Sequence, residues 1–359
     1  GMNVLEVLRG TYTIEELAVS AGEIHLTRSS RGDNWDLLNS TDSSNADINL
    51  QYFEAFEVNL TYDDVLDKSY YSSSISAMYA SGIIGNRTEL SLRADLASTN
   101  ATLEGEVFLV NAPIAGNIEL TIDQEWTLST SDLTLDGAQV ILNINQDGGQ
   151  ISAVQMDIPK ALNYVPLFEI PEKIQLNSLR ADWSWEGTWD QWVLNFDTKN
   201  TALNYNGIAV PSLSCTGQWI WGAVPELSIP SLALETNTGK ITGSLELKGD
   251  APTLYTNLEG GSNLSELFDF VETDLLVNPM GFWKGDNISL TQGFRSWEDF
   301  TPVGNPIFKG DISFFEGAFA LASSNISFEK VEAELGIDGR NIQIDRCFLQ
   351  SGENTAVVT

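Results

Sequence analysis

The chain has 359 residues and a formal net charge of −32, because its 50 acidic residues are balanced by only 18 basic ones. This shortage of Lys and Arg argues against a nucleic-acid partner and against docking on an anionic membrane through a basic patch. Since 42% of the residues are hydrophobic and 10% are aromatic, we expect a folded chain with a large core, built as two domains or one large β domain.

Both ends of the sequence suggest that it is a stretch of a longer protein. Gly1 precedes Met2, which is typical of a residue left behind by a cleaved tag. Residues 355–359 read as a β-strand without a closing turn. No run of about 18 consecutive apolar residues occurs, so we expect no membrane-spanning helix within this sequence.

The dominant hydrophobic period is two, which is typical of antiparallel strands with one dry face and one wet face. Strict alternation occurs in four runs, at residues 117–123, 241–248, 331–338 and 342–345. Turn dipeptides such as Asp136-Gly137 and Asp338-Gly339 separate such runs. We therefore predict an all-β fold with few short helices: a long curved antiparallel sheet that forms a groove or half-barrel. The alternative is two β-sandwiches.

Two segments predict short helices. Residues 161–168 lie between Pro159 and Pro171. Residues 263–271 are the better candidate, because Asn263 suits an N-cap, Glu266 follows three residues later, and the apolar residues share one face. This second helix is predicted to plug an open end or edge of the sheet; the alternative is a contact with a membrane or partner.

Catalytic and metal-binding motifs are weak, and we predict that the chain is not an enzyme and carries no metal or cofactor. The acidic pairs, among them Asp63-Asp64, are expected on wet strand faces, and the only histidine, His25, lies in an alternating strand pattern. Cys215 and Cys347 form no Cys-x-x-Cys pair, and we expect two unlinked buried thiols rather than a disulfide.

Tryptophan is concentrated in one part of the chain. Trp183 and Trp185 share a strand face, and Trp219 and Trp221 do so as well. Three roles remain open for these side chains: packing in a core, lining an apolar trough, and stacking on a sugar.

Several segments resemble the periplasmic region of the AsmA-like family. The most specific piece is Gly32-Asp33-Asn34-Trp35, which follows the strand at residues 19–28. The Trp-rich segment 179–249 and the tail 308–359 are also similar to that family as patterns of strands.

The resemblance implies a long, taco-shaped sheet with an apolar inside. It implies an AsmA-like β-groove region at residues 1–250, and at 251–359 a short helix and a C-terminal β region that continues the same sheet. Relatives of this kind, including TamB-like proteins, are anchored in the inner membrane and project into the periplasm. They are thought to pass phospholipids toward the outer membrane or to support its assembly. The anchoring segment would lie outside this sequence.

Alternation and resemblance together predict a non-enzymatic envelope protein that holds phospholipid acyl chains in an apolar β-groove, with other envelope proteins as further partners. The predicted groove residues are apolar and inward-facing: Ile118, Leu120, Ile122, Trp183, Trp185, Ile241, Leu245 and Leu247. The alternative is a surface carbohydrate-binding or adhesion module of two β-sandwiches that uses tryptophans for stacking.

Overall fold

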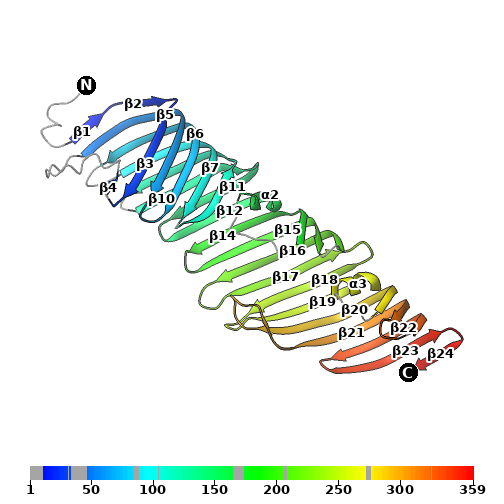
Figure 1. Cartoon of the computed structure of the whole chain (residues 1–359). Helices are drawn as coiled ribbons and strands as arrows, with labels where there is room; N and C mark the ends of the chain where they lie inside the picture. Colours follow the sequence, from blue (N-terminus) through cyan, green and yellow to red (C-terminus); the bar gives the residue numbers. More distant parts are fainter. Residues whose placement is uncertain are drawn as a thin grey trace. The chain divides into compact units, whose positions relative to one another are not determined.

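The computed structural model describes residues 11–30, 32–33, 47–84, 89–103, 105–123, 125–164, 174–205, 208–271, 276–324 and 326–359. Strands make up 80% of the structure and helices 3%, which confirms the predicted all-β class. The chain divides into two compact units (Figure 1). Unit 1 comprises Gly1–Glu169 and Asp182–Trp189, and unit 2 comprises Ile170–Ala181 and Asp190–Thr359. The predicted regions 1–250 and 251–359 stay a prediction.

Unit 1 is built from strands that pair mostly with their neighbours in the chain. Their bounds are β1 Thr11–Ile14, β2 Leu17–Ser20, β3 Glu23–Ser29, β4 Gly32–Asp33, β5 Asp47–Asp64, β6 Ser69–Ile84, β7 Glu89–Leu103, β8 Glu106–Ala112, β9 Ile114–Asp123, β10 Glu125–Leu135, β11 Ala138–Asn145 and β12 Gly148–Asp157. From β5 to β7, and from β9 to β12, successive strands pair antiparallel, and β7 pairs with both β8 and β9. Most of β14 (Arg180–Thr188) also belongs to this unit.

The first three strands depart from the predicted antiparallel arrangement. β1, β2 and β3 lie one after another along the same strand, β5, and all three run parallel to it. The sheet is therefore mixed. Alternation places a residue on a face but carries no information about strand direction, which explains why the sequence pattern missed this pairing.

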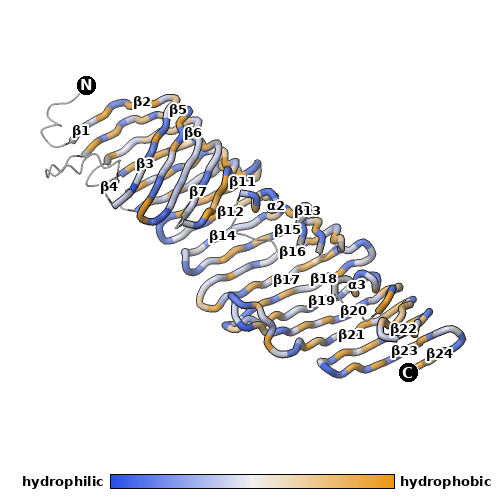
Figure 2. Tube along the Cα trace, viewed as in Figure 1, coloured by the Kyte–Doolittle hydropathy of each residue, from blue (hydrophilic) through white to orange (hydrophobic). Residues whose placement is uncertain are grey.

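Unit 2 contains β13 Ile174–Ser178, β15 Trp192–Tyr205, β16 Ile208–Trp221, β17 Glu226–Glu235, β18 Lys240–Lys248, β19 Thr253–Asn263, β20 Leu276–Phe294, β21 Pro302–Leu321, β22 Ser327–Asp338, β23 Asn341–Ser351 and β24 Asn354–Val358. Each strand from β15 to β24 pairs antiparallel with the next. The four alternating runs lie in β9, β18, β22 and β23, as predicted. Figure 2 shows this alternation of polar and apolar residues along the strands.

Tight hairpins and β-bulges shape both units. In the β10–β11 hairpin, Asp136 and Gly137 have φ values of 48° and 83°, the left-handed conformations that a two-residue turn requires. Within strand β20, Asn287 also has a positive φ, of 52°, where the pairing register with β21 shifts between Asp286 and Ser289. Because a bulge inserts one residue on one strand only, it bends that strand and increases its twist. The bulges therefore curve the sheet inside each unit.

Two short helices accompany the strands. Helix α2 (Ile158–Leu162) begins earlier than the predicted helix at 161–168, because the Asp157 side chain caps it by accepting a hydrogen bond from the backbone N–H of Lys160. Pro159 is tolerated in this first turn, where its missing N–H has no helical partner. Residues 165–168 lie outside the described part. Helix α3 (Leu264–Val271) confirms the predicted helix at 263–271.

Much of the apolar face of unit 1 packs into two buried clusters. One cluster is centred on β5, β6 and β7 and includes Val58 and Ile75, which are almost completely buried. A second is centred on β10, β11 and β12, and α2 packs against it through Ile158 and Ala161. Ile114 and Ile118 of β9 pack against both clusters. The curved sheet of unit 1 thus covers much of its own apolar face with help from α2.

A substitution at a buried position of unit 1 tests this packing. Ile75 is 2% exposed, whereas Ile141 on β11 is 45% exposed. We expect Ile75→Ala to lower the free energy of unfolding by about 2–5 kcal/mol, because it leaves a cavity. Ile141→Ala should change it by less than about 0.5 kcal/mol. Denaturant titrations of both variants measure the difference, and equal effects would contradict this packing.

A buried carboxylate stabilises the turn after β5. Asp64 accepts hydrogen bonds from the backbone N–H groups of Leu66 and Asp67, from the Tyr62 hydroxyl and from the Arg28 guanidinium. Burial, the largest single influence, raises the pKa of Asp64, but these hydrogen bonds together outweigh it, so the pKa lies below its ordinary value.

This depressed pKa predicts a pH dependence. The stabilisation by Asp64 should be complete above the unfolded-state pKa of about 3.9 and should be lost as the pH falls through the lower folded-state pKa. Asp64→Asn should therefore be less stable than wild type at pH 7, and the difference should shrink toward pH 2. Asp67→Asn is the control, because Asp67 is exposed and its carboxylate pairs with the same Arg28 guanidinium at 3.2 Å. A constant difference between pH 7 and pH 2 would contradict the role of Asp64.

Candidate functional site

The strands of unit 2 place apolar side chains in rows across one sheet face, which we call the apolar face. Residues that are direct partners in neighbouring strands lie on the same side of a sheet. Three such rows, each read from strand to strand, are Trp219–Leu227–Leu247–Leu254, Ile229–Leu245–Thr256–Leu290–Phe308 and Ile312–Leu335–Ile344. A continuous apolar surface therefore extends from β16 to β23.

Much of this apolar face is only half covered. Leu247 and Ile288 are buried, but Ile241, Leu245, Leu258 and Leu290 keep partial exposure. Ile344 is 46% exposed. Both hydrophobic clusters among the described residues belong to unit 1. The same alternating pattern thus produces two buried clusters in unit 1 and a partly open apolar surface in unit 2.

Of the predicted groove residues, the structure brings Ile241, Leu245 and Leu247 together on β18, along the apolar face of unit 2. Leu247 is 8% exposed, and the other two are half-buried. Each has an apolar partner on β17: Leu234, Ile229 and Leu227, respectively.

The remaining predicted groove residues lie in unit 1. Ile118, Leu120 and Ile122 share a face of β9, opposite Ala94, Leu92 and Leu90 of β7. All three are half-buried, and Ile118 packs against both buried clusters.

Trp183 and Trp185 of β14 also belong to unit 1. Trp183 packs against the second cluster, and its indole N–H points to the sulfur of Met156 at 3.4 Å. Trp185 stacks on Trp189 with 5.5 Å between ring centroids. Of the three roles considered for the tryptophans, core packing therefore describes Trp183.

The family-like motif is only partly described. Gly32 forms the short strand β4 with Asp33 and pairs with Ser29 of β3. Its φ of 107° favours glycine. Asn34 and Trp35 lie outside the described residues.

Helix α3 covers one part of the apolar face. Leu264 is almost fully buried, and its side chain lies beside Gly317 of β21. The helix lies mainly beside β20 and also contacts β19 and β16. At its N-terminus, the Glu266 carboxylate accepts hydrogen bonds from the hydroxyls of Thr236 and Thr238, both at 2.6 Å. The turn before β18 thereby holds the helix on the face.

The anchoring of α3 by this turn escaped the sequence analysis. The Glu at position three of the helix was visible, but it suggested a local capping box. The actual partners, Thr236 and Thr238, lie about 30 residues away, and local spacing cannot reveal them.

Three tryptophans gather where β15 begins and β16 ends. Trp192 stacks on Trp221, with ring centroids 6.1 Å apart and an interplanar angle of 16°. Trp219 meets both rings edge-on. Trp221 is 38% exposed, whereas the indole nitrogen of Trp219 is enclosed and has no hydrogen-bond partner. The trio therefore forms an aromatic margin of the apolar face.

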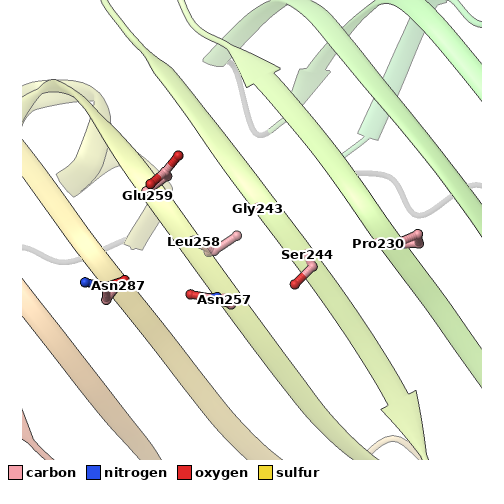
Figure 3. A pocket seen from close by; sticks show the side chains of 7 residues that line it. All are labelled: Pro230, Gly243, Ser244, Asn257, Leu258, Glu259 and Asn287. Carbon is pink, nitrogen blue, oxygen red and sulfur yellow. The ribbon is translucent and has the colours of Figure 1, made fainter.

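The opposite face of unit 2 is polar and contains a hollow of about 320 Å³. Figure 3 shows Pro230, Ser244, Asn257 and Asn287 side by side on four neighbouring strands. Ser244 and Asn257 are cross-strand partners, and Leu245, the next residue in the chain, points to the apolar face. Leu258 of the apolar face and Glu259 also line the hollow, but its amide, hydroxyl and carboxyl groups do not suit an acyl chain.

The other chemical candidates lie at ordinary surface positions or in structural contacts. His25 is exposed and lies near Glu23 and Thr61. Within the described residues, no group of three or more His, Cys, Asp or Glu side chains could hold a metal ion. Cys215 and Cys347 are free thiols, as predicted, but both are half-buried rather than buried. None of the helices in the described part is both long and apolar enough to span a membrane.

A substitution at the base of α3 tests its attachment. Removing the carboxylate in Glu266→Ala should destabilise unit 2 by about 1–3 kcal/mol, because the buried Thr236 hydroxyl loses its 2.6 Å acceptor and keeps only the Gly239 carbonyl at 3.4 Å. The variant should also bind more of the dye ANS, since Leu264 becomes accessible. Ser265→Ala, at an exposed neighbouring position, is the control. Unchanged stability and dye binding in Glu266→Ala would contradict the anchoring role.

Comparisons of the chain with protein-family models, curated proteins and solved structures found no match. The resemblance to AsmA-like proteins therefore stays a prediction.

Proposed function

We propose that this chain is a non-enzymatic envelope protein that binds phospholipid acyl chains on the apolar face of unit 2. The observation that carries the proposal is the incomplete burial of that face. Rows of Leu, Ile and Phe side chains continue across neighbouring strands, and only part of their surface is covered within the described residues. Contiguous exposed apolar surface of this kind marks an interaction site or a ligand site.

The chemistry of the face fits a hydrocarbon chain. Each CH₂ group that leaves water contributes about 0.8 kcal/mol. Micromolar binding corresponds to about 8 kcal/mol, so burial of about ten methylenes along one acyl chain supplies it without any catalytic or charged group. The rows run across the strands, whose spacing of about 4.8 Å lets one chain contact several strands.

The charge of the protein supports binding through the tails rather than the headgroup. With 18 basic against 50 acidic residues, few cations are available to hold an anionic phosphate. On β18, Glu246 and Lys248 pair with each other on the polar face. The headgroup accordingly stays in water in this proposal, while the tails lie against the apolar face.

The cellular setting belongs to the same proposal and comes from the resemblance alone. In this proposal the protein resides in the periplasm, anchored to the inner membrane by a segment outside this sequence. It conveys phospholipid in support of outer-membrane assembly, together with other envelope proteins.

Adjacent residues on opposite faces of β18 provide the test. Purified wild type should retain phospholipid that native mass spectrometry detects. Leu245→Glu should lower the retained lipid at least about tenfold, because it places a carboxylate against the hydrocarbon. Ser244→Glu adds the same charge to the polar face and should retain lipid as wild type does.

Circular dichroism and thermal unfolding establish that both variants are folded. Leu245→Ser, which introduces no charge, should show a smaller loss in the same direction. Equal lipid retention by folded Leu245→Glu and Ser244→Glu would contradict the proposal, as would wild type that takes up no phospholipid after delipidation.

Carbohydrate binding is the second candidate, and one observation favours it. Trp189 is 51% exposed and stacks on Trp185, so it presents a flat aromatic surface to solvent. A glycan array on which wild type binds and Trp189→Ala does not would support this function. Trp183→Ala is unsuitable, because Trp183 is part of the core.

A further inference from the structure

One end of the unit 2 sheet carries two groups of aromatic side chains. We call this end the aromatic rim and define it as Trp192 and residues 219–226, 248–253 and 293–303. Here β16, β18 and β20 end, and β17, β19 and β21 begin. Direct cross-strand partners join it without a break from β16 to β21: Ile220, Glu226, Lys248, Thr253, Gly293 and Val303.

The first aromatic group is the trio of Trp192, Trp219 and Trp221. Trp221 is the member of the trio that reaches solvent most. Val224, in the turn that follows β16, is 54% exposed. Apolar surface therefore continues from the trio into the turn between β16 and β17.

The second group belongs to the connection between β20 and β21. Phe300 meets Phe294 and Trp297 edge-on, with ring centroids 5.6 and 6.2 Å apart, respectively. Phe300 is nevertheless 50% exposed, and Val303 at the start of β21 is exposed as well. This group also presents apolar side chains to solvent.

Hydrogen bonds hold the connection between β20 and β21 in shape. The Asp299 carboxylate accepts one from the backbone N–H of Thr301 at 3.0 Å and one from the Arg295 guanidinium at 2.8 Å. The indole N–H of Trp297 donates to the carbonyl of Gly249 in the turn between β18 and β19, at 2.9 Å. The exposure of the neighbouring Phe300 is therefore built into the fold of this connection.

The charges of the rim do not suit an anionic surface. Its two basic residues are already paired, Lys248 with Glu246 and Arg295 with Asp299. Its acidic residues outnumber them: Glu226, Asp250, Glu298 and Asp299. A membrane rich in anionic lipid should therefore be repelled, whereas a zwitterionic one should not.

The opposite end of the same strands has a different character. There β17 and β18 are joined by residues 236–239, whose sequence is Thr-Asn-Thr-Gly. The hydroxyls of Thr236 and Thr238 donate to Glu266 at the base of α3. Exposed aromatic residues are thus a property of the aromatic rim and not of every turn in unit 2.

This combination fits the interface between a bilayer and water, where aromatic rings meet hydrocarbon while neighbouring polar groups stay hydrated. The two groups lie at the ends of β16 and β20, which are four strand spacings or about 19 Å apart. Two contacts separated along one end of a sheet match a flat target better than a single pocket. The apolar face begins at this rim, because Trp219 starts the row that continues to Leu227 and Leu247.

We infer that the aromatic rim docks on the surface of a zwitterionic phospholipid bilayer, with Trp221, Val224, Phe300 and Val303 in its interfacial layer. The inference goes beyond the proposed function, because the rim can touch a bilayer whether or not the apolar face holds a lipid. Docking places that face beside the membrane.

Flotation with vesicles of dioleoyl phosphatidylcholine tests the inference. Wild type should float with the vesicles. The double variant Val224→Ser/Phe300→Ser should lower the partition coefficient at least about tenfold, because it removes apolar surface from both parts of the rim.

The matched control is the double variant Val277→Ser/Ile326→Ser. Both residues lie at the opposite end of the sheet, and at 43% and 49% they are about as exposed as the rim residues. This variant should float as wild type does. Leu245→Glu should also float as wild type does, since it alters the apolar face and leaves the rim intact. Circular dichroism and thermal unfolding establish that each variant is folded.

Lipid charge separates apolar docking from electrostatic binding. Replacing part of the phosphatidylcholine with dioleoyl phosphatidylglycerol should weaken wild-type binding, and added salt should restore it, because the rim is acidic. Stronger binding to the anionic vesicles would overturn the inference.

A fluorescent label gives a direct readout of insertion. In a background without Cys215 and Cys347, the variants Phe300→Cys and Ile326→Cys are labelled with the dye NBD. On addition of phosphatidylcholine vesicles, the emission of the label at 300 should shift to shorter wavelength, while that at 326 stays unchanged. Equal shifts at both positions would contradict docking through the rim.

The outcomes keep the two proposals apart. Equal flotation of the folded rim variant and its control would overturn the inference, as would wild type that does not float. Wild type that fails to float yet retains phospholipid in native mass spectrometry would overturn the inference alone. Wild type that floats through the rim but retains no phospholipid would support the inference and contradict the proposed function.

Discussion

Most of the described strands have one apolar face, and that face must be removed from water or occupied by something else. Backbone pairing satisfies the peptide groups and leaves the side chains to decide stability. In unit 1 much of the apolar face closes on itself around Val58, Ile75 and Leu133, with α2 against it. In unit 2 the corresponding face is covered only in part, notably by α3. The proposed function follows from this one difference.

The bulges explain how one strand pattern can produce both outcomes. An inserted residue such as Asn287 bends its strand while the neighbouring strand continues. Glycines permit close approach of adjacent strands at such places: at Gly260, a Cβ atom would clash with the backbone of Lys240 on β18. How far a sheet curls, and therefore whether its apolar side chains meet each other, depends on where these insertions fall.

Much of the fold could be predicted from the sequence, because its signals are local. Alternation at 241–248 and 331–338 identified β18 and β22, and Asn263 with Glu266 marked the start of α3. Features that depend on distant partners could not be predicted. The parallel pairing of β1–β3 with β5 and the contacts of Glu266 with Thr236 and Thr238 are of this kind.

The candidate site shows the same limit. Ile118 and Leu245 have the same alternating surroundings in the sequence, yet Ile118 packs into a core and Leu245 stays partly exposed. Periodicity says that a side chain lies on the apolar face, but only the tertiary structure says what covers it. Similarly, six tryptophans in one region suggested aromatic packing, but the unpartnered nitrogen of Trp219 appears only when its neighbours are placed.

The central claim is that lipid tails lie on the apolar face of unit 2. The rate at which maleimide labels engineered cysteines on β18, with and without bound lipid, tests it most directly. In a background without Cys215 and Cys347, single cysteines at positions 244 and 245 report on opposite faces of the same strand. Without lipid, maleimide should modify both positions. After loading with dioleoyl phosphatidylethanolamine, labelling at 245 should slow at least about fivefold, while labelling at 244 stays unchanged. Equal labelling rates at 245 with and without bound lipid would contradict the account.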